Sequence, residues 1–186
     1  MKYSRWFYVP LLIVMSAPAF AVSGNLNLFL GQKNLNSSDW KPIEEQPEVG
    51  MLFDIRGDNW PISIAVDILG SADSYRDNKL GNHYRGSTYE FDAGVRKVFS
   101  NSESDFHPYV GGGLALVRAK LEETVSNQSV DDNSVGVWLD GGIYWTFARH
   151  FNLGLDLRYS RAKVSLIGGD AEAGGAHGGV VFGYHW

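Results

Sequence analysis

The last nine residues, GGVVFGYHW from Gly178 to Trp186, carry an apolar or aromatic side chain at every second position and end on a tryptophan. In a β-strand, Val180, Phe182, Tyr184 and Trp186 would all lie on one face. Chain termini usually fray in water, so an exposed apolar stripe at the end of a soluble chain would be unusual. The stretch therefore predicts a terminal strand whose apolar face contacts something other than water.

The same alternation recurs throughout the chain after Val22. The further runs are GNLNLFLGQ (24–32), EVGMLFDIRG (48–57), PISIAVDILG (61–70), STYEFDAGVRKVF (87–99), HPYVGGGLALVRAKL (107–121), SVGVWLDGGIYWTF (134–147) and HFNLGLDLRYSR (150–161). With the terminal run they predict about eight strands. Short connections at 57–60, 100–105 and 148–150 alternate with long polar ones at 33–46, 71–86, 122–133 and 161–174. Such alternation is typical of an up-and-down barrel with tight turns at one rim and long loops at the other.

The second face of each run decides which way the strands point. It carries glycines and the charged residues Asp54, Arg56, Asp67, Glu90, Asp92, Arg96, Asp140, Asp156 and Arg158. In a soluble sandwich or lipocalin-like barrel, the apolar face would point inward and this second face would meet water. Glycines and sparse charges suit the lumen of a narrow barrel better, because charges buried there must pair. We interpret the charged set as a structural network, with pairs such as Asp54/Arg56, Glu90/Arg96 and Asp156/Arg158.

The apolar faces end in aromatic residues at both rims. Those near the short turns are Phe99, Trp145, Phe147 and Phe151, and those near the long loops are Tyr89 and Tyr159. Aromatic girdles on either side of an apolar band are typical of transmembrane β-barrels. The pattern predicts an all-β fold, an eight-stranded antiparallel up-and-down transmembrane β-barrel.

Composition and the first residues set the context. MKYSRWFYVPLLIVMSAPAFA (1–21) has a basic start, a short apolar run and an A-x-A ending, which predicts a signal peptide followed by a barrel domain over 22–186. The chain contains no cysteine, so disulfides cannot stabilise it. The net charge of −5 disfavours a nucleic-acid partner, which would require a basic stripe.

These features together resemble a known group of proteins. The leader, the alternating strands, PYVGGGLAL (108–116) and the terminal VVFGYHW (180–186) are similar to the small OmpA-like and OmpW-like outer-membrane barrels of Gram-negative bacteria. The resemblance implies a place in the cell outer membrane, contact with its lipid and lipopolysaccharide, and both termini on the periplasmic side. It also implies that Phe182, Tyr184 and Trp186 form the signal read by the outer-membrane assembly machinery. The family usually ends in Phe, whereas this chain ends in Trp.

The sequence shows no arrangement typical of catalysis or metal binding. His83 has Asp73, Ser74 and Asp77 nearby, and His177 lies among glycines, but no motif sets up a nucleophile, a base and an acid. The five histidines lack metal-ligand spacing, no cofactor is expected, and 168–179 is interpreted as a flexible loop. Residues suited to surface contacts are Trp40, Tyr75, Arg76, Lys79, Tyr84 and Arg85, and Arg118 and Lys120 suit lipid A phosphates.

The sequence thus favours a structural or surface-interaction role without catalysis and leaves the specific ligand open. The alternative is a narrow channel for small or hydrophobic solutes, as the resemblance to OmpW-like barrels permits. A lipid A-modifying enzyme is the third hypothesis.

Overall fold

A computed structural model describes residues 22–35, 40–76, 83–99, 104–123, 128–166 and 169–186. The expected signal peptide lies outside these residues. Within them, no helix is long and apolar enough to cross a membrane.

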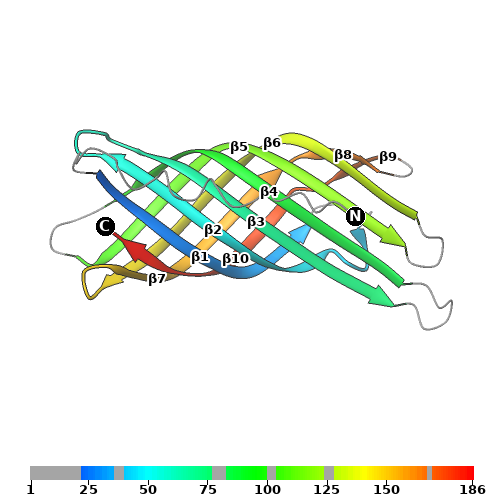
Figure 1. Cartoon of the computed structure of the whole chain (residues 1–186), viewed down its shortest axis with the longest axis horizontal. Coiled ribbons are helices and arrows are strands. Elements are labelled where there is room, and N and C mark those ends of the chain that lie inside the picture. The colour runs from blue at the N-terminus through cyan, green and yellow to red at the C-terminus, as the bar shows by residue number, and fades with distance from the viewer. Residues whose placement is uncertain (1–21, 36–39, 77–82, 100–103, 124–127, 167–168) are drawn as a thin grey trace, which may run out of the picture.

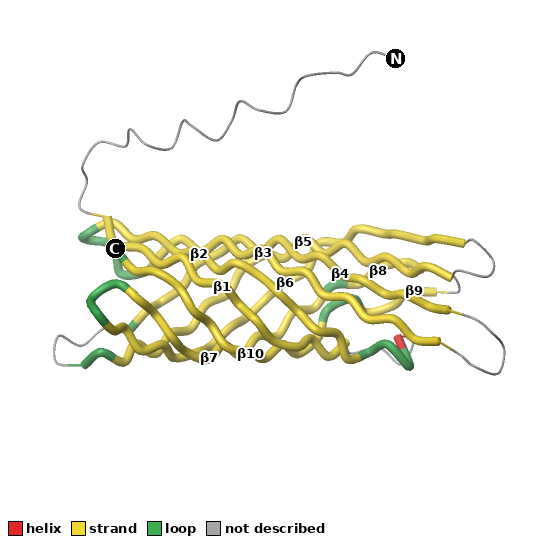
Figure 2. Tube along the Cα trace, turned by 60° about the horizontal axis from the view of Figure 1, so that its bottom comes forward, coloured by secondary structure: helices red, strands yellow, loops and turns green. Residues whose placement is uncertain are grey.

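Eight tilted strands close into a single barrel (Figures 1 and 2). They are β1 (Val22–Leu35), β2 (Glu45–Gly57), β3 (Ser63–Arg76), β4 (His83–Val98), β5 (Phe106–Glu123), β6 (Gln128–Phe147), β7 (Phe151–Arg161) and β10 (Gly175–His185). Each strand pairs antiparallel with its neighbours in the chain, and β10 closes the circle against β1. The predicted eight-stranded antiparallel barrel is confirmed.

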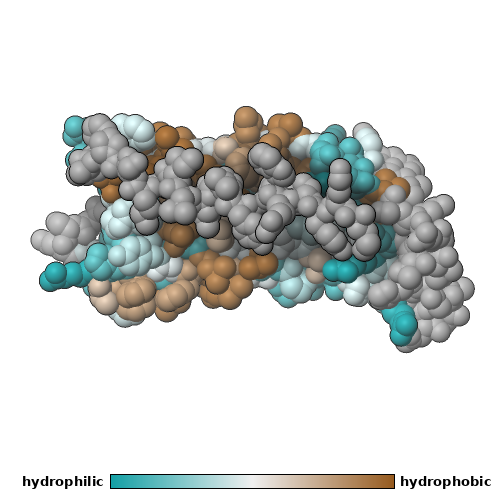
Figure 3. All heavy atoms as spheres, in the orientation of Figure 1, coloured by the Kyte–Doolittle hydropathy of each residue, from teal (hydrophilic) through white to brown (hydrophobic). Residues whose placement is uncertain are grey.

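The outside of the barrel is apolar, as the alternation predicts. Side chains such as Leu157 (69% exposed) and Leu139 (64%) point outward from the described strands, while the charged positions between them point inward. Figure 3 shows hydrophobic side chains along the middle of the visible face and hydrophilic ones toward both ends. A band of this kind is stable only against lipid, because contiguous apolar patches on soluble monomers are much smaller.

The barrel has two different ends, which we call the short-turn end and the long-loop end. The first and last residues of the barrel meet at the short-turn end, where Gly24 and Trp186 exchange two backbone hydrogen bonds of 3.1 Å. Halfway along this closing seam, a Cβ on Gly31 or Gly179 would lie within 2.8 Å of the buried Phe29 ring. These two glycines therefore leave the space that the ring fills.

Two details of the long-loop end differ from the sequence-based expectation. The strands run further than the alternation predicts. β1 continues to Leu35 and includes Lys33, whereas the sequence predicts that the loop begins at residue 33. The segment 168–179, expected to be a flexible loop, contains β9 (Gly169–Glu172) and the start of β10. β9 pairs with β8 (Lys163–Leu166) in a hairpin that precedes β10. The hairpin is held because Val164 and Ala171 are buried in an apolar cluster inside this end of the barrel.

Candidate functional site

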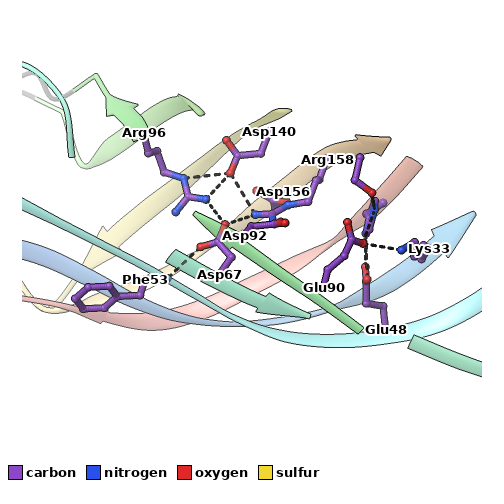
Figure 4. A network of polar contacts seen from close by, with 12 residues as sticks. Lys33, Glu48, Phe53, Asp67, Glu90, Asp92, Arg96, Asp140, Asp156 and Arg158 are labelled. Atoms are coloured by element: carbon purple, nitrogen blue, oxygen red, sulfur yellow. Dashed lines mark hydrogen bonds and ion pairs between the residues drawn. The ribbon is translucent and has the colours of Figure 1, made fainter. Parts of the chain in front are cut away.

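The barrel lumen holds two groups of buried charges, which Figure 4 shows side by side. The first, which we call the arginine network, is built around Arg96 and Arg158. The second, which we call the lysine cluster, is built around Lys33 and lies nearer the long-loop end. Both occupy the inward positions that strand alternation gives them.

Arg96 of β4 contacts aspartates from three other strands. Its Nη2 lies 2.7 Å from Asp67 Oδ2, its Nε donates to Asp140 Oδ2 at 3.1 Å, and its Nη1 lies 3.6 Å from Asp54 Oδ2. All four side chains are buried. One guanidinium therefore connects β2, β3, β4 and β6 across the lumen.

Arg158 of β7 completes the arginine network. Its guanidinium pairs with Asp67 and Asp92, lies 3.4 Å from Asp140 Oδ2 and approaches Asp156 Oδ1 to 4.0 Å. Because Asp67 and Asp140 contact both arginines, the two guanidinium groups and their acids form one unit. Arg158 is completely shielded, with a side-chain exposure of 0%.

The arginine network contains more carboxyl groups than cations, because five aspartates face two arginines. Neutral donors satisfy part of the excess. Tyr109 Oη donates to Asp156 Oδ2 at 2.6 Å, and Asn25 Nδ2 donates to Asp54 Oδ1 at 2.9 Å. Loss of Arg158 would remove the arginine that contacts Asp92 and Asp156, and loss of Arg96 would remove the arginine that contacts Asp54. Either loss would leave buried carboxylate charge uncompensated.

The lysine cluster joins strands on both sides of the closing seam. Lys33 Nζ of β1 lies 2.6 Å from Glu90 Oε2 of β4. His177 of β10 places Nδ1 2.8 Å from Glu48 Oε2 and Nε2 3.0 Å from Ser160 Oγ. Lys33 and His177 are also direct cross-strand partners in the register of the seam. The cluster therefore fixes the long-loop half of the seam through side chains as well as backbone.

Ser160, His177 and Glu48 have the connectivity of a hydrolytic triad, with the hydroxyl on one ring nitrogen and the acid on the other. Sequence motifs did not show it because the three residues come from β7, β10 and β2. All three are buried, with Ser160 at 0% exposure, so a substrate carbonyl has no approach to the hydroxyl. The geometry supports a structural hydrogen-bond chain.

Glu48, Glu90 and His177 also bring ligand atoms within 4.8 Å of one another, a spacing that could suit a metal ion. The ammonium of Lys33 already lies against Glu90 and donates to Thr88 Oγ1 at 3.2 Å. Lys33 thus supplies the positive charge that a metal would bring. Of the five residues in this cluster, strand parity predicts Glu90 as part of a lumen network and His177 as a histidine that points into the lumen, and both lie there.

The structure changes several of the proposed pairs. Glu90 pairs with Lys33 and not with Arg96, because Arg96 lies among the aspartates. Arg56 is half-buried and lines a vestibule of about 840 Å³ at the short-turn end, while Asp54 pairs with Arg96. Parity places a residue inside the barrel, but the tilt of the strands decides which residues meet.

The long-loop end of the lumen is closed by apolar side chains. Trp40 and Ile43, from the connection between β1 and β2, are each 2% exposed and belong to a cluster with residues of β5, β8 and β9. We call these two residues the plug. The expectation that Trp40 contacts an external surface is wrong, because its ring lies inside the barrel.

The remaining candidates lie on the outside or near the rims. Arg118 of β5 is exposed and lies 2.6 Å from Asp131, and Lys120 pairs with Glu122. The ammonium of Lys120 lowers the pKa of the Glu122 carboxyl below its ordinary value. Tyr75, Arg76 and Arg85 are exposed, and Tyr84 is half-buried. Lys79 and Asp77 lie outside the described residues.

Comparison with known proteins agrees with this architecture. A family model of the outer membrane protein beta-barrel domain matches residues 7–184. No curated protein matches the chain.

Solved structures share the fold at low sequence identity. Ail of Yersinia pestis, in complex with the heparin analogue sucrose octasulfate, has a TM-score of 0.63 and 13% identity, covering 89% of this chain and 99% of Ail. Neisserial surface protein A has a TM-score of 0.57 and 13% identity over 88% of this chain and 94% of its own. OprG of Pseudomonas aeruginosa has a TM-score of 0.53 and 12% identity over 89% and 94%.

Proposed function

The chain belongs to the outer membrane protein beta-barrel domain family, and from this premise we propose that it is a non-enzymatic structural or surface-interaction protein of the cell envelope. Family membership places it among the outer-membrane barrels of Gram-negative bacteria. The observation that carries the proposal is the filled lumen, where two charge clusters and the plug occupy successive levels. A closed, cross-linked barrel is suited to presenting its loops and outer wall.

Residues 1–21 are, in this proposal, a signal peptide removed on export, and the short-turn end faces the periplasm. Phe182, Tyr184 and Trp186 are the contact of the assembly machinery. The three side chains are 41–51% exposed on the outer wall, so they are accessible to a partner before lipid surrounds them.

The narrow-channel alternative makes a distinct electrical prediction. The protein reconstituted in planar bilayers should show no discrete conductance steps above the lipid baseline, because the side chains of an eight-stranded barrel fill its interior. A wide porin reconstituted in the same way is the positive control for insertion. Reproducible steps from this protein would favour the channel over the closed barrel.

The outer wall offers a site for lipopolysaccharide at the long-loop end. Arg118 is directly paired in register with Tyr89 of the aromatic girdle, and Lys120 lies two residues further toward the loops. Lipid headgroups meet hydrocarbon at the level of such a girdle. The two cations therefore lie where the phosphates of lipid A would be, with the protein's own Asp131 and Glu122 as exchangeable partners.

Replacing both cations, in Arg118→Glu/Lys120→Glu, should weaken binding of purified lipopolysaccharide by roughly tenfold or more, because each basic residue near an anionic membrane surface contributes about 1 kcal/mol. Binding is measured on detergent-solubilised protein at two salt concentrations, and the difference should shrink as salt rises. Lys97→Glu is the matched control, because Lys97 lies on the outer face of β4 near the opposite rim. Equal affinity of the double variant and the wild type would contradict the site.

A further inference from the structure

The plug occupies a position that a loop residue rarely takes. Connections between strands usually run over the surface, yet Trp40 and Ile43 turn into the lumen and are almost fully shielded. The chain makes a tight turn to do this, with Ile43 N donating to Trp40 O at 2.6 Å. The connection thus inserts a large flat ring into the barrel.

The wall around the plug is shaped for such a ring. The buried apolar residues that share its cluster at the long-loop end are mostly small: Leu35, Val117, Ala119, Ala162, Val164, Ala171 and Ala173. A Cβ on Gly86 of β4 would lie 2.6 Å from Ile43 Cδ1 and 3.3 Å from Trp40 Cζ3. Alanines and this glycine leave a narrow slot that larger side chains would close.

Few directional contacts hold the plug in the slot. Trp40 Nε1 donates to the backbone carbonyl of Glu172 in β9 at 3.0 Å, and Gln46 Nε2 donates to Ile43 O at 3.2 Å. The rest of the attraction is burial of apolar surface, which is non-directional and does not depend on a covalent link to the barrel. A free molecule with the same shape and one N–H donor could make the same contacts.

A set of hydrogen-bonded polar side chains lies beside the slot. Ser71 Oγ donates to Gln46 Oε1 at 2.7 Å and lies 2.7 Å from Thr88 Oγ1, which in turn accepts from Lys33. These groups hydrogen-bond to one another beside the plug. The apolar cluster extends past them to Trp138, whose ring centroid lies 4.9 Å from Arg158 Cζ of the arginine network. The slot that Trp40 fills accommodates one aromatic ring.

We propose that the long-loop end of the lumen is a binding site for a small, flat, neutral aromatic molecule with one N–H donor, of about the size of indole. Trp40 is its resident occupant and is exchangeable for the ligand. This inference goes beyond the structural role proposed above, because it gives the closed barrel a ligand-binding state in which Trp40 and Ile43 leave the lumen.

The first experiment removes the Trp40 ring from the slot by substitution. The Trp40→Gly protein is purified, and heat-modifiable migration on gels is used to verify that it is folded. It should bind indole saturably at one site per barrel. Indole should also raise its unfolding temperature. Wild-type protein should bind indole at least tenfold more weakly, because Trp40 competes for the slot. Trp60→Gly is the matched control, since it removes an exposed tryptophan at the short-turn end and should bind no better than wild type. No saturable binding to folded Trp40→Gly, or equal binding to wild type, would overturn the proposal.

The second experiment keeps Trp40 and tests exchange directly. The chain has no cysteine, so Ile43→Cys provides a single thiol on the plug. Maleimide labelling of this buried thiol should be slow and should accelerate severalfold at saturating indole, because a displaced plug becomes exposed. An indole-independent labelling rate would overturn exchange, even if Trp40→Gly cannot be obtained folded.

Discussion

Arg158→Met should prevent the barrel from folding stably, and this is the largest effect that we expect from any single lumen substitution. The change removes the arginine that pairs with Asp92 and one of the two arginines that pair with Asp67. Both carboxylates lie in a lumen where the Arg158 side chain has no exposure. Breaking one buried ion pair by removing a partner typically costs about 3–5 kcal/mol, and here two close pairs are lost together. Methionine keeps the apolar stem, so the loss reports on charge more than on volume.

The measurement is urea unfolding of the refolded protein in lipid vesicles, followed by tryptophan fluorescence and by heat-modifiable migration. Arg118→Met is the matched control, because the same substitution there breaks the exposed pair with Asp131 and should change the free energy of unfolding by less than about 1 kcal/mol. Adding Asp67→Asn and Asp92→Asn to Arg158→Met should restore part of the stability. Identical unfolding curves for wild type and Arg158→Met would show that the arginine network is dispensable.

Strand alternation was enough to predict the barrel and the inward position of the charged residues. Asp67, Asp92 and Arg158 all lie inside because each follows the parity of its own strand, and parity is a local property of the sequence. The same argument places Leu157 and Phe182 on the outer wall. The fold was therefore predictable from one chain without any knowledge of how the strands pair.

The partners of the charged residues were not predictable in this way. Whether Glu90 meets Arg96 or Lys33 depends on the stagger of eight tilted strands, which is a property of the closed barrel. Lys33 continues the inward parity of Asn25, Asn27 and Phe29, which is a weak signal for a place in the lumen. The polar residues that follow it favour a loop instead. A lysine with inward parity near the end of a strand should therefore be considered as an ion-pair partner for every acid that points into the lumen.

The burial of the plug was not predictable from the sequence for a different reason. Trp40 lies in a polar segment that has neither strand nor helix periodicity, so its sequence neighbours favour a surface loop. Its burial results from long-range contacts with residues such as Glu172 and Gly86, far along the chain. An isolated tryptophan in a polar loop, combined with alanines at inward positions of β5, was the available signal.

Deletion of Trp186 should reduce the assembled barrel in the outer membrane by about an order of magnitude or more, because it leaves unpaired backbone groups at the closing seam, each costing several kcal/mol in lipid. Gly24 and Trp186 exchange both backbone hydrogen bonds at this end of the seam. The indole also covers Gly24, where a Cβ would lie 2.4 Å from Trp186 Cζ2, and its centroid lies 6.1 Å from that of Phe53 on β2.

Three variants separate the two contributions of this residue to closure and assembly. Trp186→Phe keeps an aromatic ring and the backbone pair, so its membrane level should be near that of wild type. Trp186→Ala keeps the backbone pair and loses the ring, so its level should be intermediate, and the deletion should be lowest. Levels are measured by immunoblot of outer-membrane fractions, with unboiled samples to separate folded from unfolded protein. The hydrogen bonds between β1 and β10 close the barrel. If the deletion variant reached the wild-type level, neither barrel closure nor recognition by the assembly machinery would depend on the terminal residue.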